Sequence, residues 1–177
     1  MSRWETTSAK TRQLVFMGLL VAIGTLSSHV MAIPVLGAKA FPVQHAINVT
    51  AGVLLGPAQS VLVATAIATL RNLLGTGTPL AFPGSMIGAL LAGLAYEFTG
   101  YPWAACIGEV VGTGFLGALL SYPVAKWLLG KSVAALAYVV PFTLSSALGA
   151  LIGLFVVVAL LQAGVATARS KIGGKQP

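Results

Sequence analysis

Hydrophobic residues run along the chain in long blocks that are broken by glycine and proline more often than by polar stretches. Blocks of this length are typical of helices that cross a lipid bilayer, which need about 20 apolar residues each. The break at Leu54-Leu55-Gly56-Pro57 splits one long block, because a proline cannot continue a helix without losing a backbone hydrogen bond. The pattern predicts six spans, at 13–35, 44–56, 58–74, 84–98, 103–127 and 133–163.

The amino-acid composition also indicates an integral membrane protein. Hydrophobic residues make up 57% of the 177 and charged residues 7%, with a mean hydropathy of +0.94. Soluble domains with an ordinary polar surface have far more charge. No repeat, low-complexity tract or linker marks a second domain. We therefore expect one all-α integral membrane domain over 1–177, built as a bundle of six transmembrane helices.

The distribution of basic residues predicts the orientation. The net charge is +7, and six of the ten Lys and Arg residues lie near the two ends of the chain. Basic residues are enriched on the cytoplasmic side and are attracted by anionic lipid. We therefore expect a multi-pass protein of the plasma membrane with both termini in the cytoplasm, and no nucleic-acid partner.

Small residues recur at every fourth position along several predicted spans, which lets helix backbones approach closely where no hydrophobic effect drives them together. Gly18 and Ala22 form a similar pair in the first span, and this pair either packs inside the bundle or receives a helix of a partner. The other strips are Ser60, Ala64 and Ala68; Gly84, Gly88 and Ala92; Gly108 and Gly112; and Ser145, Gly149 and Gly153.

Glu109 is the only acidic residue inside a predicted span. An ionisable group at membrane depth is costly unless it is paired, hydrated or neutralised, so it is a candidate for a functional site. Thr113 lies one helical turn away on the same face. A structural carboxyl group, hydrogen-bonded to a neighbouring helix, is the alternative interpretation.

Two further polar groups stand out against the apolar background. His45 and Asn48 lie three residues apart, so they share one helix face and are candidates to line a cavity, with an interhelical hydrogen bond as the alternative. Arg71 and Asn72 end the third span and lead into the connection GTGTPLAFPGS, whose backbone N–H groups could hold an anion or a polar heterocycle. Ser85 follows in the first turn of the next helix, where capping competes with ligand contact.

Several motifs are missing from the sequence. It has no GxxxxGK[ST] phosphate loop, no HExxH and no Cys/His set with zinc spacing, so we expect no ATP hydrolysis and no metal site in this chain. It also lacks the paired intramembrane acids of a proton relay and the matching halves of many secondary transporters. We therefore expect a binding subunit that partners drive. A stand-alone carrier is one alternative. An intramembrane enzyme is the other, and it would need a second ionisable group beside Glu109.

Three stretches carry a resemblance to a known family. They are HAINVTAGVLLGPAQ at 45–59, RNLLGTGTPLAFPGSMIGALLAG from 71, and GEVVGTGFLGALLSYPVA from 108. Over roughly residues 10–165 the chain resembles the substrate-binding S component of an energy-coupling factor (ECF) transporter, and specifically the ThiW family.

The resemblance implies a six-helix membrane fold and a vitamin-like cargo, the thiazole precursor of thiamine. It implies a transmembrane coupling subunit and two ATPase subunits as partners. These partners use ATP, and this chain has no cofactor of its own. It further implies that Gly18 and Ala22 meet the coupling subunit, and that the first outer loop, at 33–44, closes over the bound cargo.

A hydroxyethylthiazole is small and mostly apolar, so its pocket needs a few directed polar groups among apolar walls. Another cargo, such as thiamine or its pyrimidine precursor, is the alternative, and a phosphate on the cargo would explain Arg71 better. The predicted polar groups of the site are His45, Asn48, Arg71, Asn72, Ser85, Glu109 and Thr113, with Phe82 and Tyr122 as stacking surfaces.

Overall fold

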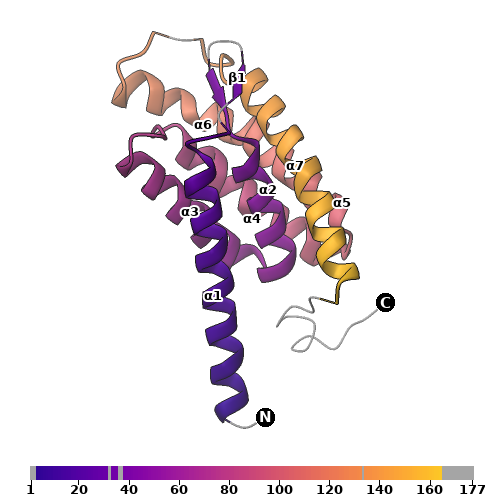
Figure 1. Cartoon of the computed structure of the whole chain (residues 1–177). Helices are drawn as coiled ribbons and strands as arrows, with labels where there is room; N and C mark the ends of the chain where they lie inside the picture. Colours follow the sequence, from indigo (N-terminus) through magenta and orange to yellow (C-terminus); the bar gives the residue numbers. More distant parts are fainter. Residues whose placement is uncertain (1–2, 32, 36–37, 133, 165–177) are drawn as a thin grey trace.

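The computed structural model describes residues 3–31, 33–35, 38–132 and 134–164, which form a helical bundle with one short β-hairpin (Figure 1). The hairpin pairs Ile33 with Ala40 and Val35 with Ala38 in antiparallel register, and it lies at the end of the bundle opposite the start of the first helix. The elements are α1 (Arg3–Ser27), β1 (Ile33–Val35), β2 (Ala38–Ala40), α2 (Pro42–Leu55), α3 (Pro57–Leu73), α4 (Ala81–Thr99), α5 (Pro102–Glu109), the π-helix η1 (Val110–Gly117), α6 (Ala118–Pro123), the π-helix η2 (Val124–Leu128) and α7 (Val139–Gln162).

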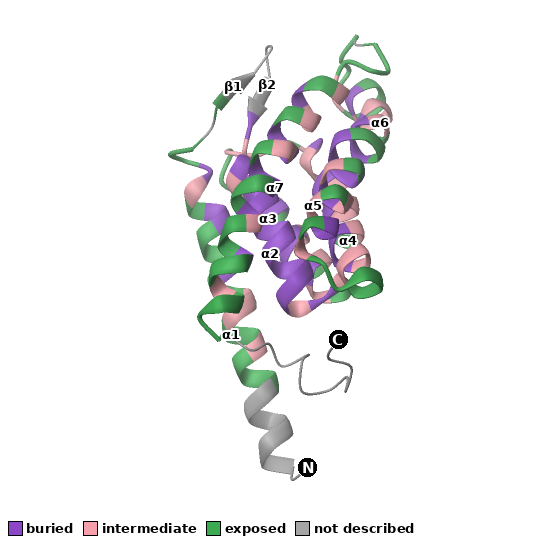
Figure 2. Ribbon diagram, turned by 90° about the vertical axis from the view of Figure 1, so that its right-hand side faces the viewer, coloured by how far each residue is buried: buried purple, intermediate pink, exposed green. Residues whose placement is uncertain are grey.

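The short helix α2 forms the centre of the bundle. It contacts α1, α3, α4, α5 and α7, and almost every residue from Pro42 to Leu54 is buried (Figure 2). A helix of 14 residues is too short to cross a bilayer alone, but protein encloses this one on all sides, so its polar side chains face other helices.

The break between α2 and α3 lies where the sequence predicts it. Gly56 adopts a positive φ of 94°, a conformation that favours glycine, and Pro57 begins α3 where a missing backbone N–H costs nothing. Ser60 then donates a hydrogen bond to the carbonyl of Ala89, 2.8 Å away, which fixes α3 against α4.

The predicted strips of small residues lie at helix contacts. A methyl group on Gly112 would lie 2.7 Å from the Cα of Gly88, and one on Gly153 would lie 2.9 Å from the carbonyl oxygen of Ala46. The Gly84–Gly88 strip therefore brings α4 close to η1, and the Ser145–Gly149–Gly153 strip brings α7 close to α2. Such contacts supply the van der Waals packing on which helix association in membranes depends.

The segment Pro102–Leu128 is one continuous helical stretch, as the sequence predicts, but two parts of it have π geometry. In a π-helix the backbone hydrogen bonds join residues five apart. Here Gly112 and Gly117, five residues apart, both face α4, against Gly88 and Gly84. The second π segment follows Pro123, which cannot donate a backbone hydrogen bond. The span predicted at 103–127 is therefore present as one helical stretch, and its π geometry is an addition that the sequence did not predict.

Two predicted spans have the wrong limits. The first helix ends at Ser27, because Ser27 and Ser28 donate their hydroxyls to the carbonyls of Gly24 and Thr25 and the chain then turns towards β1. The last helix begins at Val139 rather than at 133, because residues 134–138 form turns and Pro141 favours the first helical turn.

Within the part of the chain that the structure describes, three helical segments are long and apolar enough to cross a membrane, namely Ala81–Thr99, Pro102–Leu128 and Val139–Gln162. Large hydrophobic side chains are exposed on the outside of the bundle, including Leu14 on α1 and Leu151 and Phe155 on α7. Because an apolar outer surface suits lipid rather than water, the described helices form a membrane-type bundle. The prediction that α1, α2 and α3 are also spans stays a prediction.

Candidate functional site

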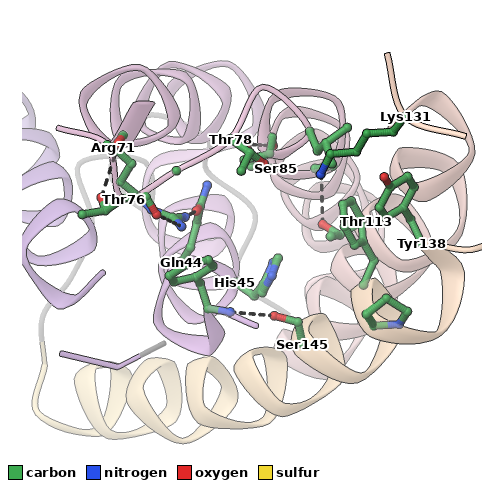
Figure 3. Close-up of a pocket in the computed structure, with 18 residues that line it drawn as sticks. Gln44, His45, Arg71, Thr76, Thr78, Ser85, Thr113, Lys131, Tyr138 and Ser145 are labelled. Carbon is green, nitrogen blue, oxygen red and sulfur yellow. Dashed lines mark hydrogen bonds between the residues drawn. The ribbon is translucent and has the colours of Figure 1, made fainter. Parts of the chain in front are cut away.

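A cavity of about 350 Å³ opens at the end of the bundle that carries the β-hairpin. Its walls come from the start of α2, the end of α3 with the following connection, the start of α4, η1, and the start of α7 with the connection before it. These elements are far apart in the sequence, so the cavity exists only in the folded bundle. Figure 3 shows Arg71, Gln44 and Thr76 at one end, His45 in the middle, and Lys131 and Tyr138 at the other end.

The middle of the cavity lies above a buried polar network. Glu109 is completely buried, and three donor groups surround its Oε1 atom: His45 Nδ1 at 2.8 Å, Thr113 Oγ1 at 2.8 Å and Asn48 Nδ2 at 3.2 Å. Asn48 also donates to the carbonyl of Ser85 at 3.2 Å, and the Thr113 hydroxyl lies 3.0 Å from the carbonyl of Gly84. The network joins α2, α4, α5 and η1, and it holds the His45 ring through Nδ1. Among the described residues, no hydrogen bond engages the other ring nitrogen, Nε2.

Gly88 makes room for this network. A methyl group at this position would overlap Thr113 Oγ1 and would lie 2.5 Å from Glu109 Oε2. The close approach of α4 to η1 is therefore also what buries the carboxylate. Glu109, the functional candidate, and the Gly84–Gly88 strip of small residues therefore lie at the same helix contact.

Arg71 forms the polar end of the cavity. Its guanidinium donates to Gln44 Oε1 through one terminal nitrogen and to the carbonyl of Thr76, 3.4 Å away, through the other. The ring of Phe41 covers the guanidinium, with 3.8 Å between the ring centroid and Cζ. Phe41 is held in turn by Ser145, whose hydroxyl accepts its backbone N–H at 3.0 Å. Arg71 thus connects the end of the hairpin to α2 and to the connection after α3.

The connection at 74–80 does not offer its backbone to an anion in the predicted way. The N–H groups of Thr76 and Gly77 both donate to the carbonyl of Arg71 at 2.9 Å, and the N–H of Gly75 donates to the carbonyl of Asn72. These groups complete the end of α3, so the prediction that they bind a ligand is wrong.

The structure brings most of the predicted site residues together, but at two depths. His45, Arg71, Ser85 and Thr113 line the cavity. Asn48 and Glu109 are not among the lining residues; they lie in the buried network that contacts His45 and Thr113.

Three predicted residues lie elsewhere. The amide of Asn72 donates to the carbonyls of Ala68 and Thr78, so it supports the connection rather than the cavity. Phe82 is not among the cavity-lining residues. Tyr122 lies at a second, shallower hollow beside Lys126.

Several residues that line the cavity are not among those predicted from the sequence. Gln44 precedes His45 and lies one helical turn from Asn48, a spacing that could have drawn attention to it. Tyr138, Phe142 and Ser145 of the last helix and its approach carry no local signal, because only the packing of α7 against α2 brings them to the cavity. The other missed polar residues are Thr76, Thr78 and Lys131.

Comparison with known proteins identifies the family. The model of one family, described as Thiamine-precursor transporter protein (ThiW), matches residues 14–163. No curated protein and no solved structure matches the chain. The family match covers most of the sequence and includes every element that lines the cavity. With its apolar helices, the chain is a multi-pass membrane protein, and it belongs to the ThiW family of thiamine-precursor transporters.

Proposed function

We propose that this chain is the substrate-binding S component of an ECF importer, and that it captures hydroxyethylthiazole, the thiazole precursor of thiamine. The observation that carries the proposal is the cavity, which combines a few directed polar groups with aromatic walls in a protein of a thiamine-precursor transporter family. Its volume of about 350 Å³ is suited to a small heterocycle.

The chemistry of the cavity suits a ring with one nitrogen and one hydroxyl. The described hydrogen bonds of His45 engage Nδ1, so Nε2 is available to a ligand in the middle of the cavity. The rings of Phe41, Tyr138 and Phe142 provide apolar faces on which a thiazole ring can stack. Ser85 and Thr113 add hydroxyl groups that can accept a hydrogen bond.

The proposed orientation places the cavity outside and both termini in the cytoplasm. The start of α1 and the end of α7 lie towards the same end of the molecule, away from the hairpin and the cavity (Figure 1). The basic residues concentrated near both ends of the sequence favour the cytoplasmic side for that end. In this arrangement α1, α2 and α3 complete a bundle of six membrane helices.

Transport requires partners in this proposal, namely a transmembrane coupling subunit and two ATPase subunits that supply the energy of ATP. The chain offers an exposed small-residue face for the coupling subunit. Gly18 and Ala22 of α1 are both exposed, and nothing lies within 4 Å of a methyl group placed on Gly18. The pair therefore does not pack inside the bundle, and it remains free for a partner helix.

The direct test is binding by the purified full chain in detergent. Isothermal titration should show saturable binding of hydroxyethylthiazole, and mass spectrometry should find the same compound co-purifying with the protein. His45→Leu should weaken this binding, whereas Tyr122→Leu, outside the cavity, should not. Tight binding of thiamine or of its pyrimidine precursor, with no binding of the thiazole, would replace the proposed cargo.

A further inference from the structure

Arg71 is buried in the cavity wall, and no acidic side chain of the described residues pairs with it. The residue is 2% exposed, and its polar contacts are the side chain of Gln44 and the carbonyl of Thr76. Its Nε–H group is buried and has no hydrogen-bond acceptor. Burying a charge without an opposite charge costs free energy, so a guanidinium in this state favours the arrival of an anion.

Gln44 adds a second unused donor at the same place. A guanidinium has donors only, so Gln44 must turn its Oε1 atom towards Arg71 and its Nε2 atom away. That Nε2 atom is buried, belongs to a side chain 4% exposed, and has no acceptor. The contact with Arg71 therefore settles the orientation of the amide, and two N–H donors of adjacent side chains are left without acceptors in the cavity wall.

The chain has little negative charge with which to satisfy them. It contains three acidic residues, and Glu109 is surrounded by His45, Asn48 and Thr113 instead. The backbone N–H groups of Thr76 and Gly77 are bound to the carbonyl of Arg71, so they do not compete for a ligand. Arg71 Nε and Gln44 Nε2 are the side-chain donors without an acceptor at this end.

We infer that the Arg71–Gln44 end of the cavity is a subsite for an oxyanion of the cargo, either a phosphate ester or a carboxylate. The inference rests on the proposed function, because it concerns the thiazole cargo. It places an oxyanion at the position where hydroxyethylthiazole carries its free hydroxyl group. Arg71 Nε and Gln44 Nε2 have almost no accessible surface, so they donate to the oxyanion after a small shift of their side chains towards the cavity. The heterocycle lies towards His45 and the aromatic walls (Figure 3). The contacts of Arg71 with Phe41 and Thr76 hold the guanidinium in place for this role.

The test compares ligands that differ only in the group at this end. The purified full chain is titrated with hydroxyethylthiazole, with its phosphate ester, and with the carboxylate analogue 4-methylthiazole-5-acetate. We expect the phosphate ester, the carboxylate or both to bind at least about tenfold more tightly than the alcohol, as charge-assisted hydrogen bonds do. The affinities of the phosphate ester and of the carboxylate analogue identify which oxyanion the subsite binds.

Gln44→Glu is the decisive variant. It has nearly the same shape and still accepts the hydrogen bond of Arg71, but it removes the Nε2 donor and supplies Arg71 with an internal carboxylate. The subsite model predicts that the preference for the anion disappears while the melting temperature is kept or raised. A purely structural Arg71 would leave the affinity ratio of anion to alcohol unchanged in this variant. Lys126→Gln, which removes an exposed charge outside the cavity, is the matched control.

The outcomes separate this inference from the proposed function. If the alcohol and the anions bind with equal affinity, or if the preference for the anion persists in Gln44→Glu, the oxyanion subsite is contradicted. The proposed thiazole cargo then still stands. A parallel titration uses the hydroxymethylpyrimidine precursor and its phosphate. Binding of the pyrimidine phosphate that Gln44→Glu abolishes, with no thiazole binding, overturns the cargo and supports the subsite. Failure of every phosphorylated and carboxylated probe to bind overturns the subsite.

Discussion

At the scale of single residues, the side chains that donate to Glu109 differ in whether they have a second hydrogen-bond acceptor. Asn48 and Thr113 each have a second acceptor, the carbonyls of Ser85 and Gly84, whereas His45 Nδ1 has Glu109 alone. Glu109→Leu would leave that imidazole without its partner, so we expect a loss of about 1–3 kcal/mol in unfolding free energy. Glu109→Gln keeps an acceptor of similar shape and should lower the melting temperature less.

The same pair of variants tests whether Glu109 reaches the ligand. Because the carboxylate lies in the network and not in the cavity lining, Glu109→Gln should change the affinity for hydroxyethylthiazole little. A fall of about 1.5–3 kcal/mol in binding free energy at unchanged melting temperature would instead mean that the charge contacts the cargo.

Gly88 allows a test of the helix contact that buries this network. Gly88→Ala places a methyl group against Thr113 Oγ1 and Glu109 Oε2, so we expect about 1–3 kcal/mol of destabilisation and weaker ligand binding, measured by thermal unfolding and titration. Gly18→Ala is the control, because open space surrounds Gly18 and alanine favours the helix. Equal melting temperatures for Gly88→Ala and Gly18→Ala would contradict the tight contact between α4 and η1.

The site residues that could be predicted from the sequence are those whose types are rare in this chain. A carboxylate, a histidine and an arginine are rare in an apolar chain, and Glu109, His45 and Arg71 all lie at or directly beneath the cavity. Ordinary residues such as Gln44 and Ser145 gain their roles from neighbours distant in sequence, so their types alone could not reveal them. The positions of Asn72 and Tyr122 show the opposite error, since a polar or aromatic side chain near a motif can serve the scaffold instead.

At the scale of elements, prediction succeeded where one residue type decides the backbone. Gly56 and Pro57 separate α2 from α3 because a positive φ and a missing N–H leave few alternatives. The end of α1 was missed because hydrophobicity continues past Ser27, while the serine side chains that turn the chain are only weak signals. The π geometry of η1 depends on contacts with α4, which no local pattern encodes.

The region around the hairpin should respond to cargo. Phe41 follows β2, lines the cavity and covers Arg71, so a bound ligand adds contacts to this segment and to residues 74–80. We expect backbone hydrogen exchange at 38–41 and 74–80 to slow at saturating hydroxyethylthiazole, measured by mass spectrometry. Residues 10–19 of α1, remote from the cavity, provide the internal reference. Unchanged exchange near the hairpin would mean that it is a passive connection.

At the scale of the whole molecule, cavity and proposed partner surface lie at different places. Gly18 and Ala22 are exposed on α1, neither lines the cavity, and α1 extends away from the hairpin end of the bundle (Figure 1). Ala22→Leu should therefore weaken co-purification with the coupling subunit, because a large side chain keeps a partner helix at a distance, while ligand affinity stays the same. Ala159→Leu, at an exposed position of α7, is the matched control. Equal co-purification of both variants would place the partner on another surface.

Energy coupling is also a property of the whole molecule. The sequence has no phosphate-binding loop, so the isolated chain has no identified means of using ATP, and binding alone cannot move cargo against a gradient. In liposomes that contain only this chain, radiolabelled hydroxyethylthiazole should bind in proportion to the amount of protein and should not accumulate inside. Addition of the coupling and ATPase subunits with ATP should start accumulation, and a non-hydrolysable ATP analogue should not. Sustained uptake against a gradient by the isolated chain would instead establish a stand-alone carrier, and the exposed face at Gly18 and Ala22 would then need another explanation.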